Sequence, residues 1–135
     1  MDKELKELFI KTIKDNYGYN IDLRPINLGL SDVCFATDMV SDEDIIYYNV
    51  FCYGVYTKEM IETLAIHEGR HLWQKKNKLK GFGSLDAKNK FFYYFNPIEL
   101  DAVCSQINFK KGKVSKIKKP SIYYRIALLA KKLSR

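Results

Sequence analysis

Apolar side chains recur at helical spacing along much of the chain, interrupted by two short stretches rich in β-branched and aromatic residues. The pattern predicts four helices, at about residues 2–15, 57–76, 97–109 and 120–133. Thr57 suits the N-cap of the second helix, and Asn96-Pro97 supplies an N-cap and a first-turn proline for the third. The apolar face of the second helix predicts a buried, central element.

The two β-rich stretches are residues 33–37 and 45–53, and both predict strands. The polar segment 41–44 between them favours an antiparallel hairpin. Residues 16–20 and the surroundings of Pro25 are predicted to be turns. The expected fold class is α+β, with a small antiparallel sheet packed on the buried helix.

The chain has 135 residues, the length of a single domain. Its net charge is +7, yet all 16 acidic residues precede residue 102, whereas 10 of the 23 Lys and Arg follow Asp101. Six lysines fall within Lys110–Lys119, which predicts a solvated linker between a core, residues 1–109, and a C-terminal helix, residues 120–135, that packs on the core. Clustered lysines also suit weak binding of nucleic acid or another polyanion.

Several classes of protein are not expected. No apolar run approaches the roughly 20 residues of a membrane-spanning helix, and the charged N-terminus does not resemble a signal peptide. Cys34, Cys52 and Cys104 are odd in number and widely spaced, so they are predicted to be reduced core thiols. A cytoplasmic location is therefore expected.

Both histidines of the chain, His67 and His71, stand in the predicted helix 57–76 with Glu68 beside the first. At about 100° per residue the two imidazoles lie roughly 40° apart on one face, close enough to share one metal ion. Glu68 lies about 60° further round, where it can reach a metal-bound water without binding the metal. This pattern is typical of zinc hydrolases.

An alternative interpretation places both histidines on the exposed face of a surface helix. The helix is mostly apolar, because it carries Met60, Ile61, Leu64, Ala65, Ile66, Leu72 and Trp73. Two histidines and a glutamate on a buried helix need polar partners, and a metal ion supplies one.

A zinc hydrolase usually has a third protein ligand, and the chain has no third histidine. Glu99 and Asp101 in the third predicted helix are the candidates, and they point about 160° apart, so only one can bind. Glu99 is favoured because Ala102, one turn along its face, permits close packing of the two helices. Asp101 is interpreted as a structural partner of Arg70 or of the preceding loop, or as a first-turn residue favoured by the helix dipole.

Two motifs, His67-Glu-Gly-Arg-His71 and Glu99-Leu-Asp-Ala102, resemble those of gluzincin-type zinc metallopeptidases, especially the minimal forms. In the ImmA/IrrE-like group a helix with Glu-x-x-Ala follows the helix with His-Glu-x-x-His. Phage and mobile-element proteins with His-Glu-x-Arg-His and Asn-Pro-x-Glu-x-Asp-Ala are more similar still. The resemblance covers about residues 45–109.

This resemblance implies a zincin-like fold in which His67, His71 and Glu99 hold one Zn²⁺ and Glu68 is the general base. Larger gluzincins place an aspartate four residues after the ligand glutamate, where this chain has Val103. The carboxylate behind the first histidine is therefore missing or comes from elsewhere.

Zincins bind a peptide substrate along an edge strand of the sheet, and residues 45–53 are expected to be that strand unless they form an ordinary one. A donor must also stabilise the oxyanion of the reaction. The candidates are Tyr93, Tyr94, Tyr123, Tyr124 and Arg125.

The sequence thus predicts a zinc-dependent metallopeptidase that hydrolyses peptide bonds in a peptide or protein substrate. The alternative is a regulatory or binding module with a structural zinc site, acting on a repressor or on nucleic acid through its basic C-terminal region. A third interpretation is a DNA-binding protein without a metal, for which steep salt dependence is expected.

Overall fold

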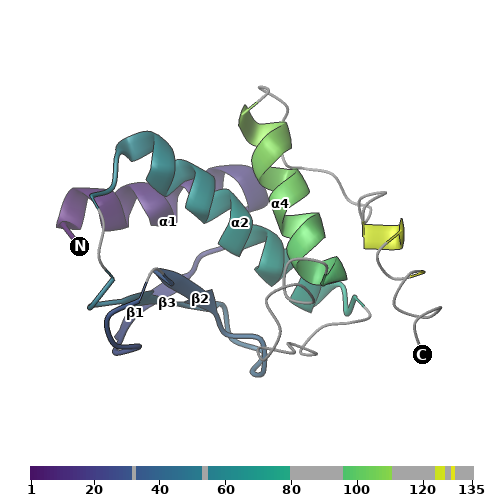
Figure 1. Cartoon of the computed structure of the whole chain (residues 1–135), viewed down its shortest axis with the longest axis horizontal. Coiled ribbons are helices and arrows are strands. Elements are labelled where there is room, and N and C mark those ends of the chain that lie inside the picture. Colours follow the sequence, from purple (N-terminus) through teal and green to yellow (C-terminus); the bar gives the residue numbers. More distant parts are fainter. Residues whose placement is uncertain (32, 53–54, 80–95, 111–123, 127–128, 130–135) are drawn as a thin grey trace.

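A computed structural model describes residues 1–31, 33–52, 55–79, 96–110, 124–126 and 129. Within these ranges the chain is α+β, with helices lying on one face of a small three-stranded sheet (Figure 1). The elements follow in the order α1 (Lys3–Tyr17), β1 (Asp22–Ile26), β2 (Phe35–Thr37), β3 (Ile45–Asn49), α2 (Lys58–Lys76) and α4 (Pro97–Lys110).

Side-chain caps fix the starts of the two helices that carry the predicted site. The Thr57 hydroxyl accepts a hydrogen bond from the Met60 amide at 3.2 Å, and the Asn96 side chain accepts one from the Ile98 amide at 3.0 Å. Both caps satisfy backbone donors that have no partner inside a helix. The predicted starts of α2 and α4 are confirmed.

The sheet is mixed, so the prediction of a wholly antiparallel sheet is wrong. β2 and β3 form the predicted antiparallel hairpin, with Phe35 opposite Tyr48 and Thr37 opposite Ile46. β3 also pairs in parallel with β1, although the residues around Pro25 were predicted to be a turn. Proline is tolerated there because β1 is an edge strand of the described sheet. Proline has no N–H to donate, and no neighbouring strand needs that donor on the outer side of an edge strand.

The strand order is β1-β3-β2, which places β3 in the centre. Both sides of Ile45–Asn49 are therefore paired, and an added peptide cannot pair with this strand. The prediction that this segment is a substrate-binding edge strand is therefore wrong for Ile45–Asn49, and the alternative, an ordinary sheet strand, is confirmed. β2 is the edge strand that contacts α2.

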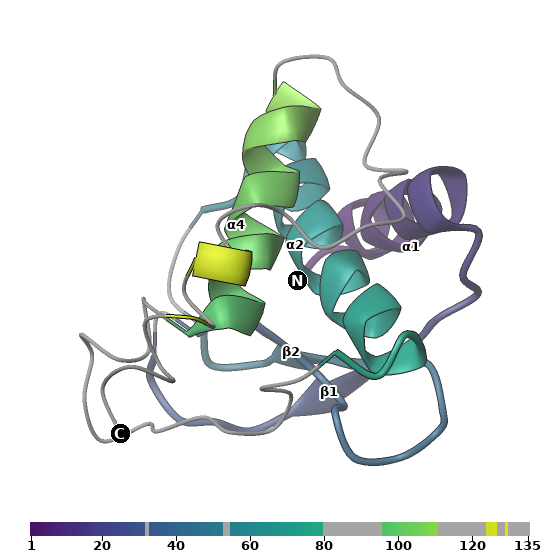
Figure 2. The same cartoon turned by 90° about the vertical axis from the view of Figure 1, so that its right-hand side faces the viewer.

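Helix α2 lies between α1 and α4 and above the sheet, as the two views agree (Figures 1 and 2). The prediction that this helix is buried and central is confirmed. Apolar side chains from α1, α2 and the sheet fill the core, namely Phe9, Ile13, Phe35, Ile46, Ile61, Ala65 and Leu72. The histidine pair is thus carried by the best-packed element of the described fold.

Gly69 lets α1 approach α2 directly behind the histidines. A Cβ at this position would stand 2.4 Å from the Tyr17 ring. The Tyr17 hydroxyl also donates to the Ile66 carbonyl at 2.7 Å, which holds the ring against α2. The glycine between Glu68 and Arg70 therefore has a packing role.

Replacing Gly69 by Ala is expected to destabilise the chain by about 1–3 kcal/mol because the added methyl group collides with the Tyr17 ring. Denaturant unfolding measures this loss. In a Tyr17→Ala background the same change should become neutral or stabilising by up to about 1 kcal/mol, since alanine favours a helix more than glycine does. An equal loss in both backgrounds would contradict the packing role.

Cys34 and Cys52 are joined by a disulfide, whereas separate reduced thiols were predicted. The antiparallel pairing of β2 with β3 and a bridge between Ser31 and Cys52 bring these distant positions together. Sequence spacing does not reveal such a contact. A cytoplasmic location stays a prediction.

The basic C-terminal region falls mostly outside the described residues. This applies to the predicted linker after Lys110 and to most of the predicted helix 120–133, of which residues 124–126 are helical. Binding of nucleic acid or another polyanion through Lys110–Lys119 stays a prediction. No helix among the described residues is both long enough and apolar enough to cross a membrane.

Candidate metal centre

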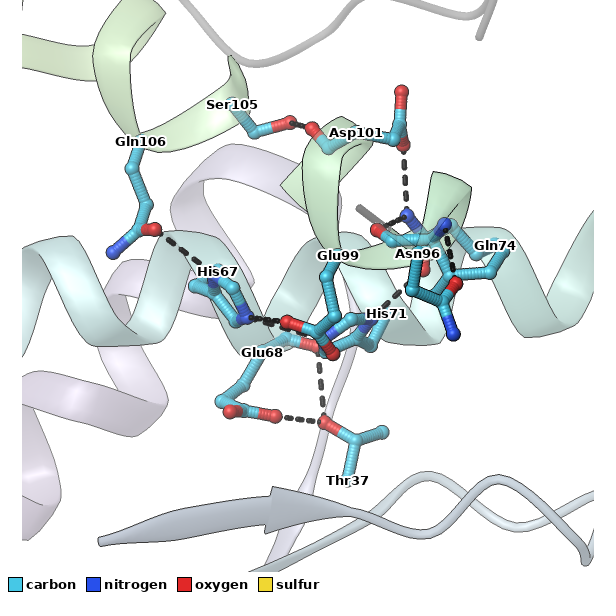
Figure 3. A network of polar contacts seen from close by, with 11 residues as sticks. Thr37, His67, Glu68, His71, Gln74, Asn96, Glu99, Asp101, Ser105 and Gln106 are labelled. Atoms are coloured by element: carbon cyan, nitrogen blue, oxygen red, sulfur yellow. Dashed lines mark hydrogen bonds and ion pairs between the residues drawn. The ribbon is translucent and has the colours of Figure 1, made fainter. Parts of the chain in front are cut away.

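Three predicted ligands meet where α4 crosses α2. His67 and His71 come from successive turns of α2, and Glu99 comes from the first turn of α4 (Figure 3). Each imidazole Nε2 lies 3.1 Å from a Glu99 oxygen, and the two Nε2 atoms lie 3.1 Å apart. The structure therefore brings the two histidines and this carboxylate to a common point.

The donor set fits a small divalent cation. Zinc bonds of about 2.0–2.1 Å at a tetrahedral centre would place the ligand atoms about 3.3–3.4 Å apart, close to the 3.1 Å between the two Nε2 atoms. Each Nε2 lies 3.1 Å from a different Glu99 oxygen, and one ligand atom from each of the three residues gives a set within 4.8 Å. Two imidazole nitrogens and a carboxylate also form the donor set of many zinc hydrolases. Within the part of the chain that the structure describes, His67, His71 and Glu99 form the one such cluster.

The outer nitrogen of each imidazole faces an amide oxygen. His67 Nδ1 lies 2.8 Å from Gln106 Oε1, and His71 Nδ1 lies 2.8 Å from Gln74 Oε1. An amide oxygen only accepts hydrogen bonds, so a neutral ring in this position carries its proton on Nδ1 and presents its Nε2 lone pair to the cluster. Two facing lone pairs beside a carboxylate need a cation between them, either a proton or a metal ion.

In the metal-free chain the pKa values of His71 and Glu99 reflect the same need for a cation between the imidazoles. Burial lowers the pKa of His71, but the hydrogen bond to Glu99 and the charges of Glu68 and Glu99 outweigh burial and raise this pKa to about 9. Burial raises the pKa of Glu99, whereas hydrogen bonds and charge from His67 and His71 bring it well below its usual value. A protonated imidazole and an ionised carboxylate thus stabilise each other.

The metal-free chain is expected to be most stable between about pH 4.5 and 6.5. The raised pKa of His71 stabilises the fold fully below its ordinary pKa of 6.5, and this contribution is lost as the pH rises through about 9. The lowered pKa of Glu99 stabilises the fold above its ordinary pKa of 4.5 and loses effect in acid. Denaturant unfolding in EDTA at a series of pH values measures how the free energy of unfolding falls on the acid side and on the alkaline side of this optimum.

Excess zinc is the control for the loss of stability at alkaline pH, because a bound zinc ion replaces the proton of His71. The loss of stability toward pH 9 should therefore disappear in excess zinc. A flat profile from about pH 6.5 to 9 in EDTA would contradict the pairing of His71 with Glu99.

Glu68 lies beside the cluster without joining it. Its side chain is buried, and its charge contributes to the raised pKa of His71. One carboxylate oxygen accepts a hydrogen bond from the Thr37 hydroxyl at the end of β2 (Figure 3). The geometry thus separates this carboxylate from the three ligands, as the helix spacing predicted.

Asp101 points away from the cluster and pairs with Arg70. The Arg70 Nε atom donates to Asp101 Oδ2 at 2.7 Å and Nη2 donates to Oδ1 at 3.2 Å. Both side chains are buried, with relative exposures of 2% and 0%. The interpretation of Asp101 as a structural partner of Arg70 is confirmed.

Sequence reasoning missed the roles of Gln74 and Gln106. Gln74 lies one turn after His71, and Gln106 lies two turns after Glu99 on the same helix face, so helix periodicity alone could have suggested both. The Gln106 amide lies behind His67, at the position where a carboxylate was predicted to be missing or to come from elsewhere. Both outer partners in this site are therefore amides.

The oxyanion donor stays a prediction. Three of its candidates, Tyr93, Tyr94 and Tyr123, lie outside the described residues. Tyr124 is buried and Arg125 is exposed. No protein-family model, curated protein or solved structure matches this chain.

Proposed function

We propose that this chain is a zinc-dependent metallopeptidase with a zincin-like arrangement of its helices and sheet. One observation carries the proposal: Glu68 stands next to a three-ligand cluster without being part of it. Structural zinc sites usually fill all four positions with protein atoms, whereas catalytic sites use three and keep one open for water. Three ligands with a neighbouring carboxylate favour the catalytic kind.

His67, His71 and Glu99 would hold the ion. A zinc ion held there would supply Lewis-acid polarisation of the scissile carbonyl and a lower pKa of the attacking water. Glu68 would take the proton of that water and deliver it to the leaving amine, so one carboxylate would act as base and then as acid. Thr37 holds one Glu68 oxygen through its hydroxyl group, which limits the rotation of the side chain.

The substrate would be an extended peptide that pairs with β2. Among the described residues β2 pairs with β3 on one side only, which is the edge position at which an extended peptide adds to a sheet. Thr37 at its end reaches Glu68 directly. A peptide added along Phe35–Thr37 would therefore run beside the general base.

Peptide hydrolysis by the purified full chain tests this function. Mass spectrometry of an unstructured peptide mixture should reveal cleavage that stops in excess EDTA and returns when zinc is restored. Cleavage that persists in EDTA would assign the activity to another mechanism or to a contaminant. A zinc-loaded chain that cleaves none of the peptides would contradict the proposal.

A further inference from the structure

Gln74 contacts a polar partner at each end of its amide although it is completely buried. Its Oε1 lies 2.8 Å from His71 Nδ1. Its Nε2 donates to the Ile98 carbonyl at 2.9 Å and to Asp101 Oδ2 at 2.8 Å. One side chain therefore links a candidate metal ligand on α2 to the first turn of α4 (Figure 3).

The chemistry of these partners allows only one orientation of the amide. A backbone carbonyl and an ionised carboxylate accept hydrogen bonds and cannot donate them. The amide nitrogen of Gln74 must therefore face Ile98 and Asp101, which leaves its oxygen facing His71. Rotating the amide by 180° would bring its oxygen against two acceptors and leave buried polar groups without partners, which is strongly unfavourable.

Asp101 is itself held as an acceptor. Arg70 donates to both of its carboxylate oxygens, in the two-pronged geometry that favours an ionised carboxylate. The Arg70 guanidinium also stacks over the Trp73 ring, 3.7 Å from its centroid. The Arg70–Asp101 pair is thus anchored on two helices before it contacts Gln74.

We propose that Gln74, oriented by the Arg70–Asp101 pair, is a positioning residue that fixes the tautomer and ring angle of His71. The proton stays on Nδ1, and the Nε2 lone pair faces Glu99 and His67, ready for a metal ion. This proposal rests on the metal site of the proposed function but does not require peptidase activity.

The second histidine provides an internal comparison. His67 contacts Gln106 in the same way, but Gln106 is only partly buried on α4. The Arg70–Asp101 pair contacts Gln74, so it orients one of the two amides. The tautomer of His71 should therefore be held more firmly than that of His67.

Nuclear magnetic resonance of the zinc-loaded chain tests the tautomer without any substitution. The chain has two histidines, so its ring ¹H–¹⁵N spectrum contains two assignable systems. His71 should show metal on Nε2 and a proton on Nδ1 that exchanges with water more slowly than the corresponding proton of His67. A proton on His71 Nε2, or equal exchange at both rings, would overturn the proposal.

Replacing Gln74 by Met preserves its approximate volume and removes both polar ends. The zinc Kd, measured by competition with a chromophoric chelator, should rise by about 10–100-fold, as is typical when a partner behind a metal ligand is lost. The slow exchange of the His71 proton should disappear. Gln106→Met is the matched control and should raise the Kd by a smaller factor.

A merely structural role predicts a different result, in which Gln74→Met lowers the stability of the metal-free chain while the zinc Kd and the His71 spectrum stay unchanged. That result would overturn the proposal. If Gln74→Met does not fold, the ring ¹H–¹⁵N spectrum of the zinc-loaded wild-type chain still tests the tautomer of His71. A chain with the expected tautomer and zinc Kd that cleaves no peptide would contradict the peptidase function and leave the role of Gln74 intact.

Discussion

Glu68→Gln is expected to abolish peptide hydrolysis while zinc stays bound. The substituted amide has the same size and can still accept the hydrogen bond of the Thr37 hydroxyl, so the site keeps its shape. It cannot take a proton from water at neutral pH. The loss of a general base lowers kcat by about 10²–10⁴-fold, and steady-state kinetics on a cleaved peptide measures it.

Glu59→Gln is the matched control, because Glu59 lies on the same helix and is exposed in its first turn. Its kcat and zinc content should equal those of the wild type. If Glu68→Gln retains full activity with zinc bound, the assignment of Glu68 as general base is wrong. If it loses zinc, the carboxylate is a ligand instead.

Glu99 and Asp101 should respond to substitution in opposite ways, although they are two residues apart on one helix turn. Glu99→Gln removes a charged ligand, so the zinc Kd should rise by more than the roughly 100-fold upper range for residues behind a ligand. The fold should survive, because Gln keeps the size of Glu and can still bond the histidines.

Asp101→Ala should damage the fold itself. It leaves the Arg70 guanidinium buried without its carboxylate, and breaking such a pair costs about 3–5 kcal/mol. Unfolding in denaturant with EDTA present measures this loss independently of zinc. If Asp101→Ala keeps its stability while Glu99→Gln unfolds, the two roles have been exchanged.

Local signals made much of this site predictable. Thr57 and Asn96 indicate where α2 and α4 begin. An N-cap side chain accepts a hydrogen bond from a backbone amide only two or three residues further along, so the signal is local. The spacing of His67, Glu68 and His71 fixes their directions once the segment is helical. The same periodicity showed that only one of Glu99 and Asp101 can bind, and the small Ala102 on the Glu99 face favoured Glu99.

Apart from Gln74, which lies one turn after His71, the misses involve contacts between distant segments. The parallel pairing of β1 with β3 joins residues more than 20 positions apart, and neither strand shows it in its own sequence. It made β3 central and left β1 and β2 as the edge strands of the described sheet. The disulfide between Cys34 and Cys52 and the amide behind His67 likewise depend on how separate elements pack.

Counting metal ions in the folded chain tests the central claim most directly. Elemental analysis of the purified chain after dialysis against zinc should find about one zinc per chain, and the triple variant His67→Ala, His71→Ala, Glu99→Gln should hold none. The melting temperature of the wild type should fall when EDTA removes the ion, because a ligand that binds the folded state stabilises it. No bound zinc, together with a melting temperature that EDTA leaves unchanged, would contradict the account.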